Sequence, residues 1–290
     1  MNSLRYFYSL SFLIALFGSE AFAQRVRPLD AIAAKLEPSK TVVYKKVGDR
    51  SLRLFVFEPD GHQPTDQRPV FLAIHGGGWT GGTPRWFYPL ADHFAQQGML
   101  AISLEYRLMN KQRGTTVFDC VKDTHSAVRY LREHAAQLGI DPQRIVIAGA
   151  SAGGHLAVGT ELFDEVNSAE DNLKTSCKPN ALILIYPVID TSEQGYGQKK
   201  IGDQWKALSP VDHVHQGVPP TLIFHGTGDT VTPFPGAQRF QDLMLSAGNH
   251  CELIPHPGGQ HGYLIFDLKL YEAGLKRMEK FLREQKMLGE

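Results

Sequence analysis

The segment 144–158 constrains the fold more than any other part of this 290-residue chain. An apolar run at 145–148 is followed by Gly-Ala-Ser-Ala-Gly, centred on Ser151, and then by a helix-like stretch. A buried strand that breaks directly into a helix needs small residues at the turn, because side chains there would clash. Such a turn lifts the Ser151 hydroxyl above the end of the strand, beside the N–H of Ala152. We interpret it as a nucleophile elbow, since the G-x-G-x-x-G and Gly-Lys-Ser/Thr patterns of phosphate loops are missing.

A serine hydroxyl is a weak nucleophile and needs three further groups. These are a general base, an acid that orients the base, and N–H donors for the negative charge that develops on a carbonyl oxygen. The donors are predicted in His-Gly-Gly-Gly-Trp at 75–79, which follows the buried-strand pattern at 70–74. The N–H groups of Gly77 and Gly78, together with that of Ala152, are expected to form a three-donor oxyanion hole.

The orienting acid is predicted at Asp229, which ends a glycine-rich loop directly after the strand-like segment 221–224. Its place in the chain gives the order serine, aspartate, histidine, which is the order that accompanies a G-x-S-x-G elbow. Asp190 is the alternative, because it also follows a strand-like segment. Asp229 could instead be an ordinary turn or capping residue before the next helix.

The base is predicted at His261, in the loop 257–263 between the last strand-like segment and the terminal helix. His256 is the nearby alternative, although it lies at the strand end with a proline on each side. Three other histidines are interpreted as packing or loop-stabilising residues: His75, His155 and His225. His213 and His215 form an H-x-H pair with no further ligands nearby, so neither a metal site nor a cofactor is expected.

Strand-like and helix-like segments alternate along most of the chain. Strands are predicted at 41–47, 51–58, 70–74, 100–104, 145–148, 181–186, 221–224 and 251–254, and helices at 86–97, 117–138, 154–163, 235–247 and 268–285. The turn Gly48-Asp49 predicts a hairpin at the start, and the alternation predicts a mostly parallel eight-stranded sheet with helices on both faces. Two segments, 164–178 and 190–219, interrupt the alternation. We expect substrate choice to depend on them, with 190–219 leaning over Ser151 as a short cap.

The chain is long enough for one large core, and its 30 basic and 30 acidic residues balance. This balance excludes a strong field for nucleic acid or an anionic membrane. Residues 1–23 resemble a signal peptide, with Arg5 before an apolar run and the cleavage signal Ala-Phe-Ala at 21–23. We therefore expect a secreted or periplasmic protein without a stable membrane anchor after cleavage. An N-terminal extension is predicted at 24–40 and the catalytic domain at 41–290.

The cysteine count leaves the disulfide question open. Cys120, Cys177 and Cys251 all follow the predicted cleavage site. Three is an odd number, so at least one thiol stays unpaired within the chain. The sequence does not say which two, if any, are bridged.

Taken together, these motifs resemble the serine esterases of the α/β-hydrolase fold. The resemblance rests on the segments 75–79, Tyr106-Arg107-Leu108, 119–142, 149–154, 225–233 and 260–263. The chain is similar to hormone-sensitive-lipase-like esterases, and more so to bacterial feruloyl and acetyl-xylan carbohydrate esterases. Met109-Asn110-Lys111 departs from the Ala-Pro-Glu of the lipase-like group. The resemblance implies an α/β-hydrolase fold and the catalytic triad Ser151, His261 and Asp229.

The resemblance also implies hydrolysis of a small-molecule or polysaccharide ester, with acetyl or feruloyl groups of plant polysaccharide as the expected acyl groups. An arylformamidase-like amide hydrolase is one alternative. A non-catalytic binding protein with this fold is another, although such proteins normally lack one triad residue. The oligomeric state is left open by the sequence.

Overall fold

The computed structural model describes residues 27–289, and the predicted signal peptide therefore lies outside the described residues. Eight strands form one sheet: β1 (Lys40–Val47), β2 (Arg50–Phe57), β3 (Arg68–Ile74), β4 (Leu100–Leu104), β5 (Ile140–Ala150), β6 (Ala181–Ile185), β7 (Thr221–Gly226) and β8 (Cys251–His256). Their order is β1-β2-β4-β3-β5-β6-β7-β8. The pairs β1–β2 and β2–β4 are antiparallel, and every later pair is parallel. The predicted hairpin and mostly parallel sheet are confirmed.

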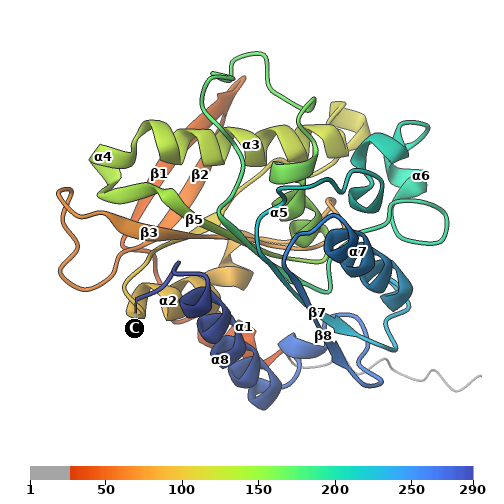
Figure 1. Ribbon diagram of the computed structural model, residues 1–290. Coiled ribbons are helices and arrows are strands. Elements are labelled where there is room, and N and C mark those ends of the chain that lie inside the picture. The colour runs from red at the N-terminus through yellow and green to blue at the C-terminus, as the bar shows by residue number, and fades with distance from the viewer. Residues whose placement is uncertain (1–26, 290) are drawn as a thin grey trace, which may run out of the picture.

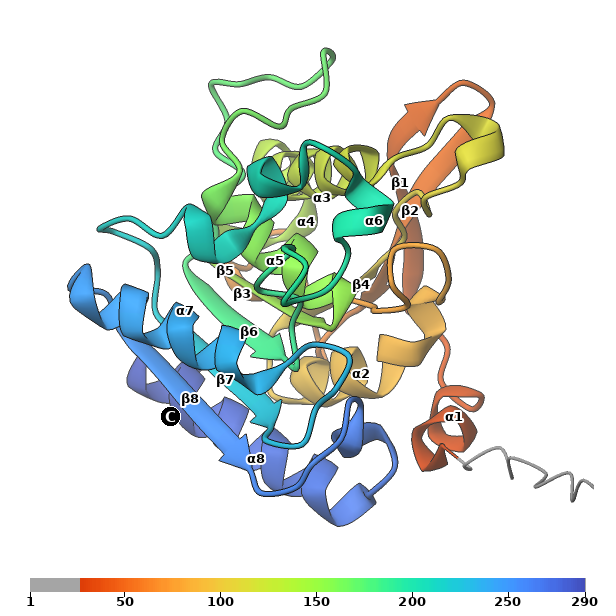
Figure 2. The same cartoon turned by 90° about the vertical axis from the view of Figure 1, so that its right-hand side faces the viewer.

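Helices cover both faces of this sheet (Figures 1 and 2). The α-helices are α1 (Pro28–Ala33), α2 (Tyr88–Gln96), α3 (Val117–Glu133), α4 (Ala135–Leu138), α5 (Ala152–Leu162), α6 (Gln198–Ile201), α7 (Phe234–Ser246) and α8 (Leu268–Glu284). Short 3₁₀ helices are η1 (Pro84–Phe87), η2 (Lys111–Arg113), η3 (Trp205–Leu208), η4 (Pro210–Asp212) and η5 (Tyr263–Ile265). The predicted helix at 117–138 is divided between α3 and α4, because His134 leaves the helical conformation.

The two faces of the sheet bury separate apolar cores. Along β3, Val70, Leu72 and Ile74 pack with α3, α5 and α7, whereas Phe71 and Ala73 pack with α2 and α8. This follows from the two-residue period of a strand, in which successive side chains point to opposite faces. Strands buried on both sides read as continuous apolar runs, as the central strands of this chain do.

The folded unit begins before the predicted boundary at residue 41. Helix α1 lies beside η1 and α2, where Leu29 and Ala33 are buried. Arg85 of η1 donates hydrogen bonds from Nη1 to the carbonyl oxygens of Ala33 and Leu36. The described part of the predicted extension 24–40 therefore packs as part of the catalytic domain.

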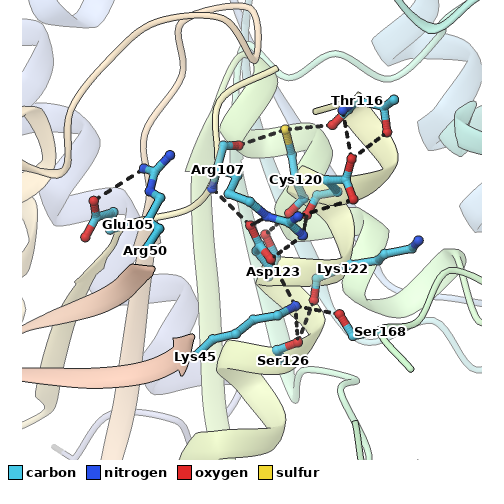
Figure 3. A network of polar contacts seen from close by, with 12 residues as sticks. Lys45, Arg50, Glu105, Arg107, Thr116, Cys120, Lys122, Asp123, Ser126 and Ser168 are labelled. Atoms are coloured by element: carbon cyan, nitrogen blue, oxygen red, sulfur yellow. Dashed lines mark hydrogen bonds and ion pairs between the residues drawn. The ribbon is translucent and has the colours of Figure 1, made fainter. Parts of the chain in front are cut away.

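A buried ion cluster joins β1, α3 and the loop after β4 (Figure 3). Asp123 of α3 has no solvent exposure. It accepts hydrogen bonds from Arg107 Nε at 2.7 Å and Nη2 at 2.8 Å, and Lys45 Nζ lies 3.0 Å from its Oδ1. Lys45 also donates to Ser126 and Ser168. The cluster fixes Arg107, the centre of the Tyr-Arg-Leu motif, in the loop that supports the carboxyl end of the sheet.

Helix α3 also holds the segment 164–178 in place. The predicted role of this segment in substrate choice is wrong. Asp171 accepts hydrogen bonds from Arg129 Nη1 and from the Ser126 hydroxyl, both at 2.6 Å. Arg129 Nε also donates to the carbonyl oxygen of Thr175. These contacts hold the segment against α3, and none of its residues lines the pocket beside Ser151. Its polar composition reflects attachment to a charged helix face.

Replacing Asp123 by asparagine is expected to lower the free energy of unfolding by about 3 kcal/mol, because the partly buried Lys45 loses its carboxylate partner and Arg107 keeps only Asp119, at 3.4 Å. Urea denaturation measures this difference. Asp141→Asn is the matched control: its partner Arg144 lies at 2.7 Å on the surface, and such pairs contribute about 1 kcal/mol or less. Equal denaturation midpoints for the two variants would contradict a stabilising role for the cluster.

All three cysteines are buried and free in the structure. Burial raises the pKa of Cys120 and Cys177, and it raises that of Cys251 to about 12. Thiols with such raised pKa values carry little thiolate at neutral pH and are poorly reactive.

None of the helices within residues 27–289 has the length and apolar character needed to cross a membrane.

Candidate active site

Ser151 occupies the turn between β5 and α5 in a strained backbone conformation. Its φ of 56° and ψ of −122° lie in a region that favours glycine. The flanking glycines permit this turn, because a Cβ atom at Gly149 would collide with the carbonyl oxygen of Gly153, and one at Gly153 would collide with that of Ile74. The Ser151 N–H donates to Ile185 of β6 at 2.9 Å, which ties the turn to the neighbouring strand. The local geometry is that of the predicted elbow.

The structure brings Ser151, His261 and Asp229 together in one hydrogen-bonded row. The distance from Ser151 Oγ to His261 Nε2 is 2.9 Å, and the distance from His261 Nδ1 to Asp229 Oδ2 is 2.7 Å. The three residues come from the ends of β5, β7 and β8, separated by up to 110 positions in the sequence. Carboxyl ends of parallel strands meet at one edge of a sheet, and this places the three loops side by side.

The surroundings of Asp229 favour its ionised form. Oδ1 accepts the N–H groups of Val231 at 2.8 Å and Thr232 at 2.9 Å, and Oδ2 accepts the Thr232 hydroxyl at 2.9 Å. Burial raises the pKa of Asp229, but the hydrogen bond and charge of His261 and the two N–H groups outweigh it, so that the pKa is lowered. A buried carboxylate that stays charged can orient an imidazole and stabilise its protonated form.

The alternative acid and base have other partners. Asp190 Oδ1 accepts the N–H of Ser192 at 2.8 Å, and its Oδ2 lies 4.0 Å from Arg239. The ring of His256 stacks on Tyr263 with the ring centroids 4.5 Å apart. His225 Nε2 donates to the carbonyl oxygen of Thr232 at 2.6 Å, and burial lowers the pKa of His225. None of the three residues forms a hydrogen bond with Ser151 or His261 within the described part of the chain.

The glycine loop after β3 lies on the other side of Ser151. Gly77 and Gly78 have φ values of 118° and 60°, which only glycine adopts without strain at such a turn. The turn is closed by the N–H of Gly81, which donates to the carbonyl oxygen of Gly77 at 3.0 Å. Within residues 27–289, the N–H groups of Gly77, Gly78 and Ala152 have no hydrogen-bond partner. They are therefore available to an oxyanion.

Tyr106 supports the glycine loop through His75, the first residue of that loop. Its hydroxyl donates to the carbonyl oxygen of His75 at 2.9 Å, and the two rings stack with centroids 4.5 Å apart. Burial lowers the pKa of His75 to about 4, so the ring is neutral at physiological pH. Tyr106 directly precedes Arg107, whose N–H donates to Asp123 in the buried ion cluster of Figure 3. The cluster therefore supports the glycine loop through Tyr106.

The segment 190–219 reaches over the same edge, as predicted for a short cap. The amino group of Lys200 in α6 donates to the Gly78 carbonyl oxygen at 3.1 Å and to the Tyr196 hydroxyl at 2.6 Å. Further back, the buried ring of His155 hydrogen-bonds the carbonyl oxygen of Leu208 at 2.8 Å. The cap is thus fastened both to the glycine loop and to α5. Figure 2 shows it beside α5, in blue-green.

A pocket of about 360 Å³ opens beside Ser151 and His261. On one side it is lined by the glycine loop and Tyr196, and on the other by Arg27, Trp86, Phe87, Tyr186 and Ile265. Behind Phe87 and Tyr186 lies a second, almost closed apolar cavity of only about 30 Å³. The apolar space behind this wall is therefore much smaller than the pocket itself.

Sequence reasoning did not single out Thr232 or most of this wall. The Thr232 hydroxyl oxygen lies 3.1 Å from His261 Nδ1. Its position three residues after Asp229, where threonine often closes a turn, could have indicated this role. The residues Arg27, Trp86 and Phe87 lie in short elements without a clear hydrophobic period. No pattern in the sequence connects them with the serine.

No group of three or more His, Cys, Asp or Glu side chains among residues 27–289 could hold a metal ion. His213 and His215 each hydrogen-bond a backbone carbonyl oxygen instead, those of Lys206 and Gln216, at 2.9 Å.

Comparison with known proteins decides the family. The BD-FAE family profile matches residues 56–244, about two thirds of the chain, including the glycine loop, the elbow and Asp229. The chain belongs to the BD-FAE family. The resemblance to α/β-hydrolase serine esterases is thereby confirmed.

Solved structures support the assignment of this BD-FAE chain. Esterase 2 of Thermogutta terrifontis, phosphoramylated by tabun, is 40% identical with a TM-score of 0.82, over 87% of this chain and 96% of that one. The same esterase has been solved phosphorylated by paraoxon, and with propionate or butyrate bound.

Curated relatives include carboxylesterase NlhH of Mycobacterium tuberculosis, 31% identical over 70% of this chain and 69% of its own length. The acetylxylan esterase of Xylanibacter ruminicola is 25% identical over 80% of this chain and 48% of its own. This BD-FAE chain spans about half the length of several such relatives, 55% for the esterase LipC of Mycobacterium tuberculosis.

Proposed function

We propose that this protein is a serine carboxylic-ester hydrolase that acts through an acyl-enzyme. One observation carries the proposal: the hydrogen-bonded row Asp229, His261 and Ser151, with spacings of 2.7 and 2.9 Å, opens into a pocket. The unpaired N–H groups of the glycine loop line the same pocket. A nucleophile, a base, an acid and oxyanion donors in one place are the complete set for acyl transfer.

Each group has a defined step. His261 Nε2 accepts the Ser151 proton as Oγ attacks the ester carbonyl, and the same proton then passes to the leaving alcohol. Asp229 holds the Nδ1–H tautomer and stabilises the imidazolium. The N–H groups of Gly77, Gly78 and Ala152 bind the tetrahedral oxyanion, and a donor of this kind contributes about 2.7–4 kcal/mol in the transition state. Water then attacks the acyl-enzyme by the same route, which regenerates Ser151 and releases the acid.

As substrates we propose acetyl and other short acyl esters, or feruloyl esters, of plant polysaccharide. A pocket of about 360 Å³ with only a small cavity behind its wall suits a short acyl group. An acetylxylan esterase among the relatives, and propionate and butyrate bound to the Thermogutta terrifontis esterase, support short acyl groups. The predicted signal peptide supports a secreted or periplasmic protein, which would meet such polymers.

With 4-nitrophenyl esters of increasing chain length, kcat/KM is expected to be highest from acetyl to butyryl and to fall by octanoyl. Longer chains outgrow a pocket of this volume, and each methylene left in water forgoes up to about 0.8 kcal/mol. Steady-state kinetics across the series checks this. A maximum at octanoyl would show that the cap forms an apolar lid instead.

Replacing Phe87 tests whether the wall behind the pocket limits the length of the acyl chain. Phe87 separates the pocket from the inner cavity, so Phe87→Ala is expected to join them and move the optimum to longer esters.

Release of acetate from acetylated xylan, and of ferulate from feruloylated arabinoxylan, separates the two proposed acyl groups. Cleavage of 4-nitrophenyl acetate without release from either polymer would leave an esterase with another carrier.

A further inference from the structure

A cation forms part of the pocket wall opposite the glycine loop. The guanidinium carbon of Arg27 lies 4.3 Å from the centroid of the Trp86 ring, and both residues line the pocket that contains Ser151 and His261. Stacking of this kind fixes the plane of a guanidinium and leaves its N–H edge free to bind. Arg27 also acts electrostatically on the hydroxyl of Tyr186, another residue of this wall.

The charge of Arg27 is incompletely compensated. Its side chain is only 22% exposed, and its Nη2 lies 3.4 Å from Oδ1 of Asp30, a carboxylate that is itself 49% exposed. The buried Nε has no hydrogen-bond partner among residues 27–289. A largely buried cation with an unpaired N–H is unfavourable unless another acceptor binds it.

No carboxylate among the described residues lines the pocket to supply that acceptor. A second cation adds to the positive field from the opposite side, because the Lys200 amino group donates to the carbonyl oxygen of Gly78 and to the hydroxyl of Tyr196. Both of these partners belong to lining residues. The pocket thus has aromatic walls and one lining cation, Arg27, with the Lys200 amino group bonded to two further lining residues.

We propose that Arg27 is a specificity-determining residue that binds a carboxylate carried by the ester substrate. The proposal rests on the proposed ester hydrolysis and names a substrate class for the same site. A carboxylate matches the planar edge of a guanidinium, and a charge-assisted hydrogen bond within a partly buried pocket is stronger than a neutral one. The carboxylate can belong to the acyl half or to the alcohol half of the ester.

Two matched pairs of alkyl esters test the proposal by pH-stat titration. Monoethyl succinate and ethyl butyrate differ by a carboxylate in place of a methyl group on the acyl half. 3-Acetoxypropanoate and propyl acetate differ in the same way on the alcohol half. The measured quantity is the ratio of kcat/KM for the anionic ester to that for its neutral partner.

Arg27→Gln is expected to lower this ratio about tenfold or more in at least one pair, as for the loss of a hydrogen bond to a charged group. Arg27→Lys keeps the charge but lacks the planar edge that stacks on Trp86, so its ratio should lie between those of the native protein and Arg27→Gln. Arg85→Gln is the matched control, since Arg85 joins η1 to α1 and pairs with Glu37 at 3.0 Å but does not line the pocket. The affected pair identifies the half of the substrate that Arg27 contacts.

An unchanged ratio in both pairs for Arg27→Gln would overturn the proposal. If kcat/KM fell equally for the anionic and neutral esters, the ratio would also be unchanged, and Arg27 would be a purely structural contact between α1 and Trp86. Failure of the native protein to cleave either neutral ester is a different outcome. It would contradict the proposed function itself, before any variant is compared.

Discussion

Ser151→Ala is expected to lower kcat for 4-nitrophenyl acetate by about 10⁶, the order of loss for removal of a serine nucleophile whose triad acts as a unit. The fold should be retained, because alanine occupies the same turn and the two flanking glycines are unchanged. Steady-state kinetics together with the thermal unfolding midpoint measures both effects. Ser192→Ala is a matched control, since Ser192 lies in the cap and its hydroxyl accepts the N–H of Gln194.

Paraoxon provides a check that does not depend on the choice of substrate. An activated serine attacks the phosphorus of paraoxon and displaces 4-nitrophenolate, so the reagent should label Ser151. Peptide mass spectrometry of the treated native protein locates the diethylphosphoryl group, and Ser151→Ala should stay unlabelled. Substantial turnover by folded Ser151→Ala, or labelling at another residue, would remove Ser151 from the mechanism.

Asp229→Asn is expected to lower kcat by about 10⁴, through stabilisation of the wrong imidazole tautomer. The asparagine oxygen can still accept the N–H groups of Val231 and Thr232, as Oδ1 of Asp229 does. Its amide group, however, presents a donor to His261 Nδ1. The loop is retained, but the amide donor holds His261 in the Nε2–H tautomer, which cannot accept the Ser151 proton, so the loss should appear in kcat and not in the unfolding midpoint.

Asp190→Asn is the control for this prediction, because Asp190 also follows a strand but hydrogen-bonds Ser192 in the cap. Its kcat should stay within about threefold of the native value. If Asp190→Asn caused the larger loss, the acid would have been assigned to the wrong loop. Parallel kinetics on the two variants gives the ranking directly.

The three residues of the hydrogen-bonded row could be proposed from the sequence because each follows a parallel strand of the sheet. In a parallel sheet, the loops after those strands converge on one edge, so order along the chain and glycine content narrowed the choice to Ser151, Asp229 and His261. The alternatives Asp190 and His256 follow strands too. Only the direction of their side chains, which packing determines, separates them from the predicted residues.

What the sequence could not show depends on contacts between distant segments. Arg27 lies in a short N-terminal element with no hydrophobic period, and its place in the pocket follows from packing of α1 on η1. The segment 164–178 was misinterpreted for a related reason. It has the composition of a solvated loop, and its partners on α3 lie some 40 positions earlier.

The positive φ of Ser151 also bears on how this protein can evolve. A non-glycine residue in such a conformation costs roughly 1–3 kcal/mol, a large share of the 5–15 kcal/mol by which typical domains are stable. A descendant released from its chemical task would gain folding free energy by exchanging this serine for glycine. Stability and activity therefore make opposite demands on this position, since glycine would relieve the backbone and remove the nucleophile.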